Sequence, residues 1–268
     1  MTDLTLAPLS NFDVGAIASA AIAFAALRTR SLDGGGAVAA FAVGTATFGA
    51  LGLAGAAVLL AFFVSSVALS RLGRARKTVA LADVGKTGPR DAAQVFANGG
   101  VAAACALLAL WADARFADAF AGALAAATAD TWGTEIGTLA RRAPRSILTL
   151  RRTAAGLSGG VTWPGTLAEA GGALFIAAVA RAVPLGAHAP RALAGVAIAG
   201  MAGALTDSIL GASLQSLRYC PQCRRPTERE PHGCGANTQA LRGLSWLGND
   251  GVNFAATLVG AAVAFGVA

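Results

Sequence analysis

The stretch "AVAAFAVGTATFGALGLAGAAVLLAFFVSSVALS", residues 37–70, runs for 34 positions without a charged side chain. One helix of that length would measure about 51 Å at 1.5 Å per residue, whereas the hydrocarbon core of a bilayer is about 30 Å thick. The glycine-rich piece "GALGLAG" at 49–55 interrupts the run. We therefore expect two membrane-spanning helices here, over 34–51 and 53–70.

The whole chain has the composition of a membrane protein. It is 55% hydrophobic and 13% charged with a mean hydropathy of +0.61, whereas soluble domains contain about 25% charged residues. The apolar runs lack the alternating pattern of a membrane β-barrel. We predict one all-α integral-membrane domain over 1–268, a polytopic transmembrane bundle of about eight spanning helices at 14–29, 34–51, 53–70, 91–111, 117–138, 163–183, 191–216 and 250–268. The start "MTDLTLAPLSNFD" lacks the basic region of a cleavable signal peptide.

The basic residues predict the orientation of this bundle. If eight helices alternate, 18 of the 21 Lys and Arg residues lie in loops on one side, after the first helix and at about 71–90, 139–162 and 217–249. The positive-inside rule makes that side cytoplasmic and puts both termini outside. It also explains the pI of about 10.2 without a nucleic-acid partner. We expect the chain to lie in a prokaryotic plasma membrane, in contact with its lipids.

Two acids in "AAATADTWGTEIG", residues 125–137, interrupt a run that is otherwise typical of a membrane interior. Ionisable groups inside a membrane are costly, so Asp130 and Glu135 are candidate functional residues. Five residues separate them, or about 140° around a helix, so they do not form a metal site alone unless Gly133 permits a bend. With Asp207 and Asp250 from other segments they could hold Mg²⁺, which prefers oxygen ligands. We expect catalytic roles for Asp130, Glu135 and Asp250.

Three similar tetrapeptides occur at or near the expected cytoplasmic starts of helices: "NGGV" at 98–101, "SGGV" at 158–161 and "NDGV" at 249–252. Glycine admits a ligand close to the backbone, and a helix N-terminus favours anions. Close helix packing is the alternative explanation. As phosphate- or nucleotide-binding residues we expect Lys86, Arg90, Gln94, Asn98, Gly99, Gly100, Ser158, Gly159, Gly160, Asn249 and Asn253.

Buried acids that meet basic, glycine-rich segments are typical of magnesium-dependent phosphoryl transfer, in which the protein mainly positions groups and neutralises charge. The competing interpretation is a transporter or flippase, in which buried acids carry an ion or proton. An inverted repeat of broken helices would favour transport, but these repeats all enter from one side. A purely structural membrane subunit would leave the acids unexplained.

The last basic loop contains "CPQCRRPTEREPHGCG", residues 220–235. Its three cysteines and one histidine, Cys220, Cys223, His232 and Cys234, could bind a structural zinc ion within 219–236. The alternative is a turn-rich loop with free thiols, since a disulfide is not expected on the cytoplasmic side. Cys105 lies in an apolar segment and is expected to be buried.

Several motifs together resemble the integral-membrane family named domain of unknown function 92, which includes transmembrane protein 19 and phytyl-phosphate kinases. These are "RDAAQVFANGG", "ATADTWGTEIG", "SGGVTWPGT", "HGCG" and "WLGNDGVNF", in the family's order. The resemblance implies an enzyme that transfers the γ-phosphate of a nucleoside triphosphate, CTP by expectation, to phytyl or another isoprenoid monophosphate. Two positions depart from the family's pattern: Ser158 replaces a usual Asn, and Gly248 replaces Asp or a larger residue.

Overall fold

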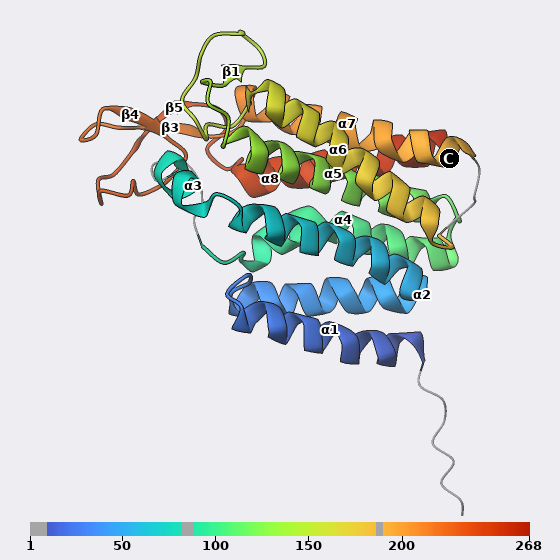
Figure 1. The fold of residues 1–268 in the computed structure, drawn as a ribbon. Coiled ribbons are helices and arrows are strands. Elements are labelled where there is room, and N and C mark those ends of the chain that lie inside the picture. The colour runs from blue at the N-terminus through green and yellow to red at the C-terminus, as the bar shows by residue number, and fades with distance from the viewer. Residues whose placement is uncertain (1–9, 82–87, 186–189) are drawn as a thin grey trace, which may run out of the picture.

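The structure is a computed structural model that describes residues 10–81, 88–185 and 190–268. Long helices lie roughly side by side and form a bundle, which confirms the all-α membrane-protein fold class (Figure 1). The helices are α1 (Asn11–Arg28), α2 (Gly34–Arg71), α3 (Arg74–Leu81), α4 (Ala92–Trp111), α5 (Phe116–Gly137), α6 (Trp163–Ala182), α7 (Pro190–Ser213) and α8 (Asn249–Val267).

Helix α2 folds back on itself at Gly52. This glycine has φ 58° and ψ −147°, a conformation that is not helical and that only glycine adopts readily. Beyond it the chain returns, because Arg71 at the end of α2 donates a hydrogen bond to Ser31 Oγ, just before its start, at 3.1 Å. Figure 1 shows the two arms lying side by side. The 34-residue apolar run is therefore a helical hairpin, as its length predicts.

The described helices account for about eight crossings of the bundle. Six of them are long and apolar enough to span a membrane: α1, α2, α4, α6, α7 and α8. Helix α2 contributes two arms, and α5 has 22 residues but carries Asp118, Asp130 and Glu135, which lower its hydropathy. Figure 1 shows α1 beginning, and α8 ending, at the same end of the bundle.

Helix α5 lies at the centre, packed by α4, α6, α7 and α8. All residues from Ala117 to Ala129 are buried, so this helix has no lipid-facing side over that length. A helix that is apolar all round is typical of a buried position. Its many alanines let neighbouring backbones approach, as small residues do in membrane bundles. One close approach is between Gly122 and α8.

We predict that Gly122→Ala destabilises the bundle. A Cβ at Gly122 would lie 2.5 Å from the Gly260 carbonyl oxygen and 2.4 Å from Ala264 Cβ, so α5 and α8 would have to separate. Overpacking of this kind costs about 1–3 kcal/mol. Thermal unfolding in detergent should show a midpoint several degrees lower. Gly266→Ala is the matched control, because its Cβ meets nothing within 4 Å. Equal midpoints for the two variants would contradict this packing.

The connections at the other end of the bundle contain more structure than the predicted loops. Helix α3 lies within the expected loop 71–90, and β1 (Arg145–Ser146) pairs with β2 (Gly160–Val161) within 139–162. The expected loop 217–249 forms a small antiparallel sheet in the order β4-β3-β5, made of β4 (Arg225–Thr227), β3 (Leu217–Cys220) and β5 (Gln239–Arg242). These strands and α3 gather at one end in Figure 1, which we call the stranded end.

Candidate functional site

A cavity of about 1420 Å³ opens at the stranded end of the bundle. Nine of the 14 acidic residues of the sequence border it, together with only five arginines from the described part of the chain. The acids are Asp33, Asp91, Asp130, Glu135, Glu169, Asp207, Glu228, Glu230 and Asp250, and the arginines are Arg90, Arg141, Arg142, Arg218 and Arg229. The lining is therefore acidic in a chain of net charge +7. A cation bound in the cavity would offset this excess.

Three of these acids form the centre of the polar wall. Asp130 of α5 and Asp207 of α7 lie within hydrogen-bonding reach of each other, and Glu169 of α6 lies close enough to both to interact electrostatically. Asn253 of α8 donates its amide N–H to Asp207 Oδ1 at 2.9 Å when the amide is oriented to face acceptors. Four helices thus converge on one carboxylate cluster, which we call the acid centre (Asp130, Glu169 and Asp207).

Gly133 makes room for the third acid rather than bending α5. The helix is continuous from Phe116 to Gly137, and a Cβ at Gly133 would lie 2.5 Å from Glu169 Cγ. The bend at Gly133 that would let Asp130 and Glu135 form a metal site as a pair is therefore absent from α5. The sequence analysis left Glu169 without a role. Its position in the apolar segment 163–183 could have identified Glu169 as a candidate functional residue, since ionisable groups are costly in a membrane.

Glu135 faces a different partner from Asp130. Lys77 of α3 donates to Glu135 Oε2 at 2.5 Å and to the Leu69 carbonyl oxygen at 2.6 Å. The Lys77 side chain is only 5% exposed and that of Glu135 20%, so this is a largely buried ion pair. The two acids of "AAATADTWGTEIG" do not share one helix face, as their spacing predicts. In the sequence alone, Lys77 is one of several basic residues in the expected loop 71–90.

The segment before α4 contributes cationic and amide groups to the cavity. Arg90 is held by backbone hydrogen bonds with Ser31 and Asp33, and its guanidinium faces Glu135. Burial lowers the pKa of Arg90, and the nearby charge of Glu135 opposes that shift. Gln94 and Asn98 of α4 also border the cavity. Lys86, expected to bind phosphate, lies outside the described residues.

Only one of the three glycine tetrapeptides begins a helix. "NGGV" lies inside α4, whose N-cap is Asp91, and "SGGV" runs into β2, ahead of the α6 N-cap Thr162. Two of their glycines allow close packing, because a Cβ would lie 3.2 Å from Val43 Cγ1 at Gly99 and 2.4 Å from Ala212 Cβ at Gly159. Gly100 does not border the cavity. The expected position is therefore wrong for "NGGV", which lies within a helix, whereas "SGGV" does lie near the start of α6.

The third tetrapeptide, "NDGV", is the first turn of α8. Its N-cap is Gly248, and within the described chain no side chain caps the turn. Gly248, Asn249, Asp250 and Asn253 all border the cavity. The backbone N–H groups of a helix start favour an anion, so among the three this turn has the geometry expected of an anion site.

A hydrogen-bonded network closes the cavity beside β2. Glu228 accepts bonds from the Ser158 backbone N–H at 2.8 Å and the Ser158 hydroxyl at 3.1 Å, while Gln215 donates to both residues. Burial raises the pKa of Glu228, and the bonds from Ser158 oppose the shift. The Ser158 N–H is thus engaged within the protein. Glu228 and Gln215 were not expected from sequence, because long-range loop contacts leave no local pattern.

The cavity continues into an apolar region between α1 and α2. Its border includes Ile22 of α1 and Phe48, Leu53 and Phe63 of α2. Along the first arm of α2, the lining extends from Asp33 to Phe48, about 22 Å at 1.5 Å per residue. One continuous cavity therefore offers a charged end and a long apolar end, which is suited to an amphiphilic ligand.

The sequence matches that of a family described as "Integral membrane protein DUF92" over residues 17–261. The chain belongs to this family. It is also 33% identical over 198 residues to Protein PGR of Arabidopsis thaliana, in an alignment that covers 64% of this chain and 67% of the plant protein. No solved structure gives a significant match. The resemblance seen in the sequence motifs is confirmed, and the DUF92 match spans every residue of the acid centre.

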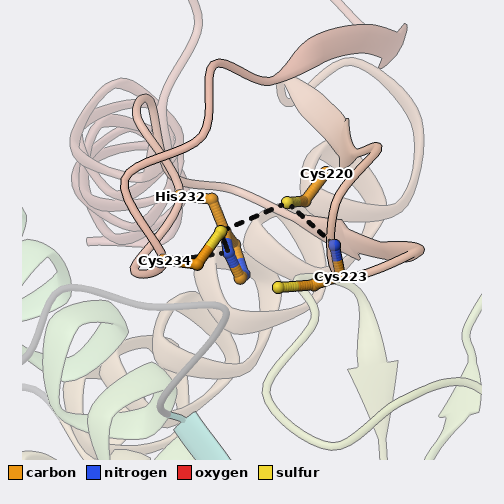
Figure 2. Close-up of side chains that lie close together, drawn as sticks. All are labelled: Cys220, Cys223, His232 and Cys234. Carbon is orange, nitrogen blue, oxygen red and sulfur yellow. Dashed lines mark hydrogen bonds between the residues drawn. The ribbon is translucent and has the colours of Figure 1, made fainter.

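The DUF92 chain has a second cluster of ligand-type side chains, in the sheet at the stranded end. One ligand atom from each of Cys220, Cys223, His232 and Cys234 lies within 4.8 Å of all the others. Figure 2 shows these four side chains turned toward one another. The structure therefore brings together the four residues that sequence spacing groups as a possible metal site.

Proposed function

We propose that this protein is a membrane-embedded isoprenoid-phosphate kinase. An oxygen of phytyl or another polyprenyl monophosphate attacks the γ-phosphorus of a nucleoside triphosphate, which breaks the bond to the β-phosphate, forms the isoprenoid diphosphate and releases the nucleoside diphosphate. The observation that carries this proposal is the single cavity, which joins an acid centre and Arg90 to an apolar region along α1 and α2. CTP is the donor implied by the family resemblance, while the cavity itself does not select a nucleotide.

The acid centre fits a magnesium site. Asp130, Glu169 and Asp207 supply carboxylate oxygens from three helices, which are the hard ligands that Mg²⁺ prefers alongside substrate phosphates. Bound Mg²⁺ would neutralise phosphate charge and hold the phosphates in line for transfer. Arg90 and the first turn of α8 are positioned to bind phosphate oxygens on the same wall. Asp250, within that turn, would add a further carboxylate.

The acceptor needs little activation by the protein. A phosphate monoester already carries nucleophilic oxygen, so positioning and charge neutralisation contribute most of the catalysis. The sequence contains only two histidines, of which His232 lies in the cysteine cluster and His188 falls outside the described residues. The isoprenoid tail would lie in the apolar region beside Phe48 and Phe63.

We further propose that the stranded end faces the cytoplasm. Arg71, Arg74, Arg141 and Arg142 lie there, whereas the opposite end has Arg115 in an exposed ion pair with Asp113. The positive-inside rule favours this orientation. Nucleotides would then reach the cavity from the compartment that contains them, and both chain termini would lie on the other side of the membrane.

The direct test is a transfer assay on the purified protein. Phytyl or geranylgeranyl monophosphate is incubated with labelled CTP or ATP, with Mg²⁺ or with excess EDTA. We expect labelled isoprenoid diphosphate that depends on both Mg²⁺ and the acceptor. If none of the combinations of donor and acceptor yields diphosphate, the proposal is overturned. Uptake of isoprenoid monophosphate into proteoliposomes without a chemical change would favour the transporter alternative.

A further inference from the structure

The small sheet β4-β3-β5 contains four side chains that approach as metal ligands do. The Cys220 and Cys234 sulfurs are 3.7 Å apart, and His232 Nδ1 lies 3.1 Å from the Cys234 sulfur. Cys223, in the turn after β3, directs its backbone N–H to the Cys220 sulfur at 3.4 Å. Figure 2 shows this turn and the His232–Cys234 loop converging from two sides.

These distances fit a tetrahedral metal site. With a Zn–S bond of about 2.3 Å, two sulfurs of a tetrahedron lie about 3.8 Å apart, close to the Cys220–Cys234 separation. A disulfide requires sulfurs about 2.0 Å apart, and all three cysteines are free thiols in the structure. Three sulfurs and one imidazole nitrogen form a ligand set that selects zinc over magnesium or calcium, which prefer oxygen.

The sheet itself lacks the apolar core that would hold it together. Its strands have four, three and four residues, and every residue of β5 is exposed. A sheet this small rarely buries enough apolar surface to be stable without a metal or a disulfide. Ligand-type side chains are among its most buried groups: Cys220 is 0% exposed and His232 3%, beside Thr227 at 0%. A metal would replace the missing core.

The sheet also positions part of the cavity wall. Glu228 follows β4 directly and accepts the two hydrogen bonds from Ser158. Arg218 of β3 borders the cavity and donates to Thr238 Oγ1 at 2.6 Å and to Glu230 at 2.6 Å. Glu228 and Arg218 lie only a few residues from the cysteine cluster in sequence. A change in the conformation of the cluster would therefore displace both side chains.

We propose that Cys220, Cys223, His232 and Cys234 bind one structural Zn²⁺ ion, which folds the segment 217–242 and holds Glu228 against Ser158. The site is separate from the magnesium-binding acid centre. Its existence does not depend on the kinase activity, because the bound metal can be measured without any substrate.

The test is metal analysis of the full chain, purified without chelators or affinity metals. Wild type should contain about one zinc per chain, and the double variant Cys220→Ser/Cys223→Ser should lose at least nine-tenths of it. Cys105→Ser is the matched control, because Cys105 is a buried thiol in α4, outside the cluster, and this variant should keep its zinc. Wild type without zinc, or a double variant with full zinc, would overturn the proposal.

A second measurement on wild type covers the case in which the double variant does not fold. Removal of zinc with a membrane-permeant chelator should accelerate tryptic cleavage after Arg224 or Arg229 at least tenfold, and added Zn²⁺ should restore resistance. Cleavage after Arg141 and Arg142, which lie in the separate α5–β1 connection, is the internal control. Unchanged cleavage after complete zinc removal, or a disulfide between two of the cluster thiols, would contradict a structural zinc ion.

Discussion

Asp130→Asn should abolish phosphoryl transfer while the bundle remains folded. Asp130 lies where α5, α6 and α7 converge, within hydrogen-bonding reach of Asp207. The amide has nearly the same shape, so packing around α5 is kept, but it removes one negative charge from the proposed magnesium site. Loss of a direct metal ligand weakens metal binding and charge neutralisation together, so we expect transfer to fall by at least about 10²-fold.

Three measurements on Asp130→Asn separate a catalytic loss from a folding defect. Initial rates are compared over a range of Mg²⁺ concentrations, and higher Mg²⁺ should recover part of any weakened binding. The thermal midpoint in detergent should stay within a few degrees of wild type. Asp113→Asn is the control, because Asp113 pairs with Arg115 at the opposite end and should retain full activity. Wild-type rates for Asp130→Asn would remove this residue from the site.

The sequence predicts the helices better than it predicts the shape of the site. The hairpin in α2 follows from chain length alone, since 34 apolar residues cannot cross a bilayer once. The location of the acids at one end of the bundle follows from the number of helices and from the distribution of Lys and Arg among the loops. The central place of α5 follows less directly: its alanines look like those of any membrane helix until the structure shows all residues from Ala117 to Ala129 buried.

The failures of sequence analysis concern contacts between helices. The glycines of "NGGV" and "SGGV" have the same letters whether they approach a ligand or another helix, and the structure shows that Gly99 and Gly159 approach Val43 and Ala212. Gly133 likewise makes space for Glu169, a relation that no local spacing encodes. Glu169 and Glu228 join the cavity only through tertiary packing, so one sequence without its fold could not assign them.

Lys77→Met should destabilise the protein strongly. The Lys77 ammonium group is nearly buried between Glu135 Oε2 and the Leu69 carbonyl near the end of α2, so its removal leaves the carbonyl without this donor and leaves Glu135 with Arg90 as a more distant cation. Removing one partner of a buried ion pair costs about 3–5 kcal/mol, because the other charge stays buried and uncompensated. The thermal midpoint in detergent should therefore fall far more than for Asp113→Asn, which removes an exposed pair.

The double variant Lys77→Met/Glu135→Gln identifies the cause of this loss. If the uncompensated Glu135 charge destabilises Lys77→Met, removing that charge should recover much of the stability, and the two substitutions will be strongly non-additive. If Lys77 acts mainly on the Leu69 carbonyl, the double variant will be no more stable than Lys77→Met. The phosphoryl-transfer activity of Glu135→Gln is measured as well. Near wild-type transfer would assign Glu135 to holding α3 against α5, whereas a loss as large as that of Asp130→Asn would return it to the magnesium site.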